Sequence, residues 1–238
     1  MPEYRIYVED REVVTPGELL AEGQVIASDG TYREGDKVYS KVTGLASIEG
    51  RKVRVIPLSG PYVPTKGDYV IGIVQEVKFS SWLLDIRAPT PGVLHVSEFV
   101  DEEVDLITTD LSEYLREGDV VGALVQEVDP VKRVKLTTKG EAMNPLGRLK
   151  DGRIVEIDPV KVPRVIGRRG SMVRMLKDVL GCDIFVGING RIFIRAREEP
   201  REIREDLAVR AIVEIERRSH LSGLTDWLES TLKRLSRW

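Results

Sequence analysis

The segment 162–172 constrains the fold of this chain more than any other stretch. It places a Gly-x-x-Gly loop, Gly167 to Gly170 with Arg168 and Arg169 in the middle, between two short apolar runs of helical period. Glycines let the main chain approach a phosphate because no Cβ stands in the way. The helix that follows begins with free N–H groups directed at the same phosphate, and the arginines add positive charge. The segment therefore predicts two helices joined by a loop that holds the backbone of a nucleic acid.

The elements around this loop predict an α+β domain over residues 144–219. They are expected to be a strand over 152–158, a short helix over 159–166, an amphipathic helix over 171–180, strands over 183–186 and 191–195, and a helix over 200–219. Strand, helix, Gly-x-x-Gly loop, helix, strand, strand, helix is the order of a type I KH domain. Such domains clamp the backbone of single-stranded RNA with this loop.

Within this domain we expect the loop to clamp the RNA backbone, with flanking arginines on phosphates and an isoleucine lining a base groove. The candidate RNA-binding residues are Arg164, Ile166, Gly167, Arg168, Arg169, Gly170, Ser171 and Arg174. In the alternative interpretation the glycines only cap two helices and the arginines are solvated. Asn189 lies in the predicted hairpin turn 187–190, where we expect its side chain to satisfy backbone groups as the chain turns.

Residues 63–140 show the pattern of a small β-barrel. Strand-like runs occur at 69–77, 82–86, 92–96, 120–128 and 133–137. Five short strands with one long connection between the third and the fourth are typical of an OB-fold. Gly72 and Gly122 occupy matching places in two long strands, where a glycine usually marks the coil or bulge that closes a barrel.

The two ends of the chain carry weaker signals. Residues 1–62 alternate in short β-rich runs, such as 38–42 and 52–58, separated by turns, which predicts an all-β domain without visible chemistry. The tail 220–238 contains an amphipathic pattern over 224–235 that predicts one more helix, either packed on the domain before it or contacting a partner. The predicted fold is therefore multidomain, with an all-β domain, an OB-fold barrel, a type I KH domain and a C-terminal helix.

Charge is distributed unevenly along the chain. The net charge is −3, but residues 151–197 contain ten Lys and Arg against five Asp and Glu, whereas 101–119 contains eight acids and one arginine. A basic module next to acidic surface fits a nucleic-acid partner, although a high charge content also suits a heat-adapted surface. The single Cys182 indicates a reducing compartment. With two histidines and one cysteine the chain has too few of the usual ligands for a zinc site. No apolar run or N-terminal signal indicates a membrane segment or secretion.

The arrangement of these domains resembles a known family. The barrel is similar to an S1-type RNA-binding motif, above all in the run 92–98, Gly-Val-Leu-His-Val-Ser-Glu. An N-terminal β-domain, an S1-type barrel and one KH domain, in that order, resemble the RNA exosome cap subunit family called ribosomal RNA-processing protein four. The segments 55–64 and 187–190 also look like that family. The intact Gly-x-x-Gly loop and the compact length favour an archaeal version.

This resemblance implies a non-catalytic RNA-binding protein. The lone cysteine and the residue composition add the expectation of a cytoplasmic protein without cofactor or metal. Three cap subunits of the family sit on a hexameric ring of phosphorolytic, RNase PH-like subunits. They bind single-stranded RNA and guide its 3′ end into the central pore for 3′-to-5′ degradation. The N-terminal domain, 1–62, is expected to make most of the contact with the ring.

The barrel departs from the usual S1-type pattern at its aromatic position. Leu83 stands where an aromatic residue is common, with Trp82 one residue earlier, and a shift of one residue along a strand reverses the face. Trp82 is therefore either a base-stacking residue or a core residue. His95, Phe79 and Lys78 are the further tentative RNA contacts of the barrel.

Two other functions fit parts of the sequence. A stand-alone transcription or translation factor can also join an S1-type barrel to KH modules, although such factors typically carry paired KH modules. Polynucleotide phosphorylase contains both modules as well, but in the opposite order and after large catalytic domains for which 238 residues leave no room.

Overall fold

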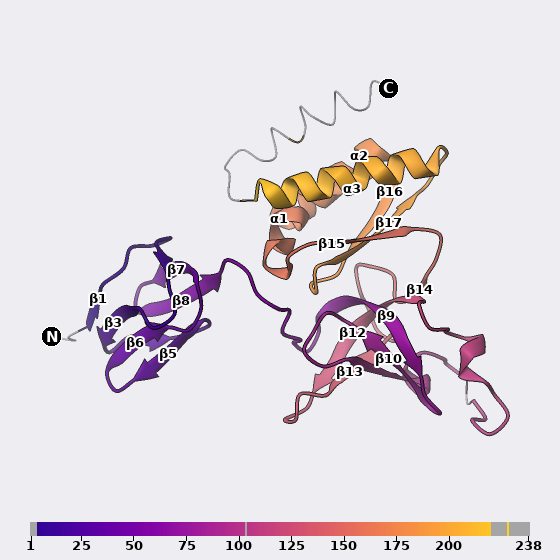
Figure 1. The fold of residues 1–238 in the computed structure, drawn as a ribbon, viewed down its shortest axis with the longest axis horizontal. Coiled ribbons are helices and arrows are strands. Elements are labelled where there is room, and N and C mark those ends of the chain that lie inside the picture. Colours follow the sequence, from indigo (N-terminus) through magenta and orange to yellow (C-terminus); the bar gives the residue numbers. More distant parts are fainter. Residues whose placement is uncertain (1–3, 103, 220–227, 229–238) are drawn as a thin grey trace. The chain divides into compact units, whose positions relative to one another are not determined.

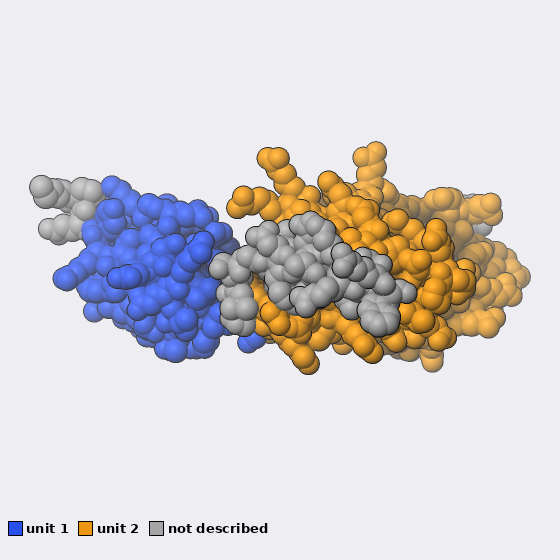
Figure 2. Space-filling model, turned by 90° about the horizontal axis from the view of Figure 1, so that it is seen from above, with its two compact units in different colours: residues 1–60 blue, residues 61–238 orange. Residues whose placement is uncertain are grey.

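The computed structural model describes residues 4–102, 104–219 and 228, and the chain forms two separate units, residues 1–60 and 61–238 (Figure 1, Figure 2). The first unit contains β-strands only. The second unit contains the barrel and the helical domain together. The predicted C-terminal helix over 224–235 lies outside the described residues apart from Leu228, which is buried.

The first unit consists of two four-stranded sheets, in the strand orders β1-β3-β6-β5 and β2-β7-β8-β4. Their bounds are β1 Tyr4–Ile6, β2 Val13–Val14, β3 Leu19–Gly23, β4 Ile26–Ala27, β5 Thr31–Glu34, β6 Lys37–Ser40, β7 Gly44–Glu49 and β8 Lys52–Pro57. Alternate residues point inward, so that Val14, Val38 and Val55 belong to one apolar core. The all-β prediction for this region is confirmed.

Five strands of the second unit close into the predicted OB-like barrel. They are β9 Tyr69–Val77, β10 Ser81–Asp85, β11 Gly92–His95, β12 Val120–Val128 and β13 Val134–Thr137. β9 pairs with β10 and β12, β10 with β11, and β13 with both β11 and β12, which closes the ring of strands. Two short 3₁₀ helices, Val96–Glu98 and Leu111–Glu113, lie in the long connection between β11 and β12.

A sixth strand corrects the predicted boundary at residue 144. β14 Gly147–Leu149 falls inside the region assigned to the KH domain, but it pairs antiparallel with β12 of the barrel. Three residues carry too little periodicity to reveal their partner, and β12 offers a free edge beyond its pairing with β13. The barrel therefore extends to Leu149.

The last part of the chain has the predicted type I KH order. Its sheet has the order β15-β17-β16, and its helices lie on one face of that sheet (Figure 1). The elements are β15 Arg153–Glu156, a 3₁₀ turn Pro159–Lys161, α1 Val162–Ile166, a 3₁₀ turn Arg168–Gly170, α2 Ser171–Leu180, β16 Cys182–Val186, β17 Arg191–Ala196 and α3 Arg201–Arg217. Leu176, Ile184 and Ile212 are fully buried between the helices and the sheet. The amphipathic pattern of 171–180 thus reflects packing of α2 on this core.

Asn189 connects the KH domain to the barrel. Its side chain is fully buried and makes three hydrogen bonds to barrel main chain: it accepts from Ile71 N–H at 3.2 Å and donates to the carbonyls of Ile71 and Ile86 at 2.9 and 3.0 Å. The predicted structural role is therefore correct in kind, but the satisfied groups belong to the barrel and not to the hairpin of Asn189 itself. The two modules are held together by a buried polar contact.

An ion-pair network surrounds this contact. The guanidinium of Arg191 is buried and pairs with Asp85 of the barrel and with Glu156 of β15, the latter at 2.8 Å. Arg87 of the barrel donates to the Ile157 carbonyl at 2.7 Å. Burial raises the pKa of Asp85, but the hydrogen bonds from Arg191 and from the Arg87 main chain outweigh it, and the net pKa is lowered. The carboxylate therefore keeps its charge at this junction, which fixes the KH domain relative to the barrel.

Candidate nucleic-acid interface

The Gly-x-x-Gly loop is a tight turn with a left-handed backbone, in which the Gly170 N–H donates to the Gly167 carbonyl at 3.1 Å. Gly167, Arg169 and Gly170 all have positive φ, at 74°, 53° and 75°. Gly170 is the N-cap of α2 and makes no side-chain capping bond. The N–H groups of the first turn of this ten-residue helix therefore have no side-chain acceptor from the cap, and the Ser171 N–H donates to the Arg168 carbonyl within the loop.

The two loop glycines are required for different reasons. A Cβ on Gly167 would lie 2.7 Å from the Cβ of Met172, and its φ of 74° with ψ of 172° is a conformation that other residues essentially never adopt. A Cβ on Gly170 would meet nothing within 4 Å. Gly167 thus allows the loop to pack on α2, whereas Gly170 supplies only a left-handed backbone.

We expect Gly170→Ala to lower the free energy of unfolding by about 1 kcal/mol, the cost of a left-handed alanine. Gly167→Ala should cost about 2 kcal/mol more, because strain and overpacking add. Chemical denaturation of the two variants compares these values. Equal losses would contradict the assigned role of Gly167.

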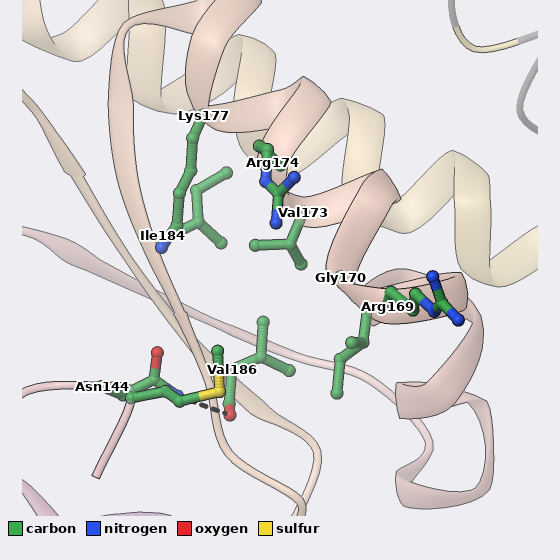
Figure 3. Close-up of a pocket in the computed structure, with 10 residues that line it drawn as sticks. Asn144, Arg169, Gly170, Val173, Arg174, Lys177, Ile184 and Val186 are labelled. Carbon is green, nitrogen blue, oxygen red and sulfur yellow. Dashed lines mark hydrogen bonds between the residues drawn. The ribbon is translucent and has the colours of Figure 1, made fainter.

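A pocket of about 270 Å³ opens beside the loop (Figure 3). Its walls come from α1, the loop, α2, β16 and the connection before β14. Its lining residues are Met143, Asn144, Ile166, Arg169, Gly170, Val173, Arg174, Lys177, Ile184 and Val186. Four of the residues predicted from sequence therefore meet in one pocket, namely Ile166, Arg169, Gly170 and Arg174. The other four predicted residues lie in or next to the loop but do not line the pocket, namely Arg164, Gly167, Arg168 and Ser171.

The pocket also contains residues that the sequence analysis missed. Gly170, Val173, Arg174 and Lys177 follow one another at helical spacing, so the period of α2 would have indicated Val173 and Lys177. Burial lowers the pKa of Lys177, and the ammonium lies 5.5 Å from the ring centre of Phe185. Met143 and Asn144 carried no comparable signal, because they belong to a connection without periodicity.

The cations of this surface are available to a ligand. Arg164, Arg168, Arg169 and Arg174 are exposed, and none of them forms an ion pair with another residue in the part of the chain that the structure describes. The lining residues include no carboxylate. The site thus combines unpaired cations with apolar walls, which is the chemistry that phosphates and a base require.

In the barrel, three of the four tentative contacts gather at one end. Phe79 is 72% exposed in the turn between β9 and β10, and Lys78 is exposed beside it, in an ion pair with Glu76. His95 is exposed at the end of β11, where it pairs with Ser81 in the register of β10. An aromatic ring, an imidazole and a cation therefore share one surface.

The assignment of Trp82 as an RNA contact is wrong. Its side chain is fully buried, donates from Nε1 to the Leu115 carbonyl at 3.1 Å, and packs edge-to-face against Phe99. Trp82 and Leu84 occupy the inward face of β10, so the ring fills the barrel core and cannot stack on a base.

The described residues contain no group of three or more metal-ligating side chains that could hold a metal ion. Among the same residues, no helix has both the length and the apolar character needed to cross a membrane.

Two family models match this chain, one in its N-terminal part and one in its C-terminal part. The family model for the N-terminal domain of the exosome RNA binding protein RRP4 matches residues 11–59, and the KH domain model matches residues 152–200. A protein named exosome complex component Rrp4 from Methanopyrus kandleri is 71% identical over 239 residues, covering 100% of both chains. The protein of that name from Pyrococcus abyssi is 47% identical over 228 residues, or 96% of this chain and 84% of the relative. A crystal structure described as an exosome complex RNA-binding protein superimposes with a TM-score of 0.67 at 39% identity, covering 75% of this chain and 98% of the other.

Proposed function

Since this chain belongs to the Rrp4 family of exosome components, we propose that it is a non-catalytic subunit that binds single-stranded RNA for degradation. It caps a hexameric ring of RNase PH-like subunits, with three copies on each ring, and guides the 3′ end of the RNA into the pore. We also propose that it acts in the cytoplasm, because its one cysteine, which is buried and free, suits a reducing compartment.

The observation that carries this proposal is the pocket beside the Gly-x-x-Gly loop. Unpaired arginines, the start of α2 without a side-chain cap and an apolar cavity meet within one surface. The barrel offers Phe79, His95 and Lys78 as a second contact for RNA. Stacking on an exposed aromatic ring and charge along the backbone hold single strands with little sequence preference. Two such contacts on one rigid unit suit a protein that holds RNA and passes it on.

The first unit presents a surface that suits docking on the ring. Val13 of β2, Leu45 of β7 and Ile56 of β8 are direct cross-strand neighbours on the outer face of one sheet. Val13 and Ile56 are 57% and 44% exposed, and Leu45 is half-buried between them. A continuous row of exposed apolar side chains marks a protein interface more often than free surface. We assign the ring contact to this row.

The double variant Val13→Asp/Ile56→Asp tests this docking. We expect this variant to lose co-purification with the hexameric ring of the same organism, because burying two unpaired carboxylates in the interface costs free energy. Its RNA binding should be unchanged. Lys41→Asp is the matched control, since it changes the net charge of the same unit by the same two charges at an exposed loop position. Full retention of the double variant on the ring would refute docking through this row.

The non-catalytic role has a direct test of its own. The purified protein should release no nucleotides from RNA in the presence of phosphate, and its addition to the ring should increase degradation of a single-stranded substrate. Phosphorolysis by the protein alone would overturn the proposal.

A further inference from the structure

We propose that the connection between the barrel and the KH domain completes the base-binding pocket, and that Asn144 in it selects adenine and cytosine through their N6 and N4 amines. This inference rests on the proposed function, because it assigns a base preference to the same RNA site. The segment concerned, residues 138–146, belongs to neither module by sequence pattern, yet Met143 and Asn144 line the pocket together with Arg169 of the loop.

The connection is held in place at both ends. Thr138 donates from its main-chain N–H and from Oγ1 to the Glu98 carbonyl, at 3.0 and 2.9 Å. Tyr69 of β9 donates from its hydroxyl to the Pro145 carbonyl at 3.0 Å, and β14 then pairs with β12. A Cβ on Gly122 would lie 2.5 Å from both the Pro145 oxygen and the Tyr69 hydroxyl, so the sequence leaves room for this contact.

The barrel that anchors the connection is itself fixed to the KH domain through Asn189 and Arg191. The place of Asn144 relative to the pocket is therefore set by the packing of two modules. In Figure 3 Asn144 and Val186 lie on one side of the pocket, and Arg174 and Lys177 of α2 extend from the other side.

The orientation of the Asn144 amide follows from its contact with β16. Its Nδ2 lies 3.5 Å from the main-chain oxygen of Val186, at the edge strand of the KH sheet. Because a carbonyl can only accept, the amide nitrogen faces Val186 and the amide oxygen is left as an acceptor. Asn144 is half-buried, so that this oxygen is partly shielded from water.

Met143 supplies an apolar surface on the same side. Its side chain is fully exposed, although it lines the pocket, whose other apolar residues include Ile166, Val173 and Ile184. An exposed methionine is costly to leave in water and adapts its unbranched thioether to flat partners. A cavity of about 270 Å³ is slightly smaller than the usual range for ligand pockets, which suits one base.

The free oxygen of Asn144 decides which base fits. Adenine and cytosine carry an exocyclic amine that donates to an acceptor, whereas uracil and guanine carry a carbonyl oxygen at the equivalent position. A carbonyl facing the Asn144 oxygen would leave two acceptors in contact without a proton between them. The pocket should therefore take adenine or cytosine in preference to uracil.

Binding of equal-length oligoadenylate, oligocytidylate and oligouridylate to the full-length protein tests this inference. The wild-type protein should prefer the first two by roughly two- to tenfold, the value of one hydrogen bond. Asn144→Ala should remove this preference, so that the three oligonucleotides bind with similar affinity. Met143→Ala should weaken all three oligonucleotides and leave their order unchanged.

A second measurement locates the effect. The sequence contains only two asparagines, Asn144 and Asn189. On titration with oligoadenylate, the side-chain amide NMR signals of Asn144 should shift, and those of Asn189, buried at the junction, should stay in place as an internal reference.

The outcomes separate this inference from the proposed function. A preference that Asn144→Ala does not change, or an Asn144 signal that does not move, overturns the inference, while RNA binding that depends on Arg168 and Arg169 still supports the proposed function. Absence of RNA binding by the wild-type protein overturns both.

Discussion

Replacing Arg168 and Arg169 together by alanine is expected to weaken binding of single-stranded RNA about 25-fold at 0.1 M salt. Each phosphate neutralised on a single strand contributes about 0.7 to the slope of log affinity against log salt, so the loss of two contacts should reduce that slope by about 1.4. Extrapolated from 1 M to 0.1 M salt, the same two contacts account for the fold-change. Fluorescence anisotropy over a salt series measures both quantities.

The structure explains why this substitution should strongly weaken RNA binding and leave the fold of the loop unchanged. Both arginines are exposed in the loop, and neither makes an ion pair within the described residues, so no internal partner competes with phosphate. Arg169 has a φ of 53°, and alanine bears the same backbone strain there as arginine does. The loop conformation should therefore survive the substitution.

Arg210→Ala/Arg217→Ala is the matched control. Both residues are exposed on α3, and neither lines the pocket. The control removes the same charge from the same domain and should leave the salt slope unchanged. If both double variants weaken RNA binding equally, the loop arginines act only through the net charge of the domain. If the loop variant binds RNA with unchanged affinity, the loop does not clamp the RNA backbone.

Asn189→Ala is expected to lower the free energy of unfolding of the second unit by about 3–9 kcal/mol. The substitution leaves one N–H and two carbonyl groups of the barrel buried without partners, and each such group costs about 1–3 kcal/mol. For a unit of this size the loss corresponds to a drop in melting temperature on the order of 10 °C. We also expect the barrel and the KH domain to unfold in separate calorimetric transitions, because this contact joins them.

Two further substitutions sharpen this test. Asn189→Asp keeps an acceptor for Ile71 N–H but sets a buried carboxylate against the carbonyls of Ile71 and Ile86, and should destabilise at least as strongly as alanine. Ile188→Ala, at the neighbouring residue that is 38% exposed, should have a small effect. A single transition at the wild-type temperature in Asn189→Ala would contradict the role of this side chain as the link between modules.

Local sequence patterns were sufficient for the order of the five barrel strands and of the KH elements. The helical period of 171–180 and the left-handed loop glycines predicted α2 and the exposed turn before it, since helix propensity and backbone freedom depend on near neighbours. The apolar runs 69–77 and 120–128 predicted β9 and β12 with their bounds unchanged. Four of the pocket residues followed from the loop and its flanks alone.

Side-chain environments required the tertiary structure. The sequence placed Trp82 one residue from the usual aromatic position, but only the pairing of β10 with its neighbours, which includes an irregularity between Leu83 and Leu84, showed that its ring points into the core. β14 was assigned to the wrong module, because three residues without periodicity reveal no partner.

By itself, the sequence determined three domains, the Gly-x-x-Gly loop and its basic surroundings, because each depends on contacts within a few residues. The tertiary structure alone decided that Asn189 reaches Ile71, 118 residues away, and that Asn144 reaches Val186, 42 residues away. Such contacts depend on how two modules pack, and no local propensity encodes them. The Gly-x-x-Gly loop is thus predictable from the sequence, whereas the place of Met143 and Asn144 beside it depends on how the barrel and the KH domain fold against each other.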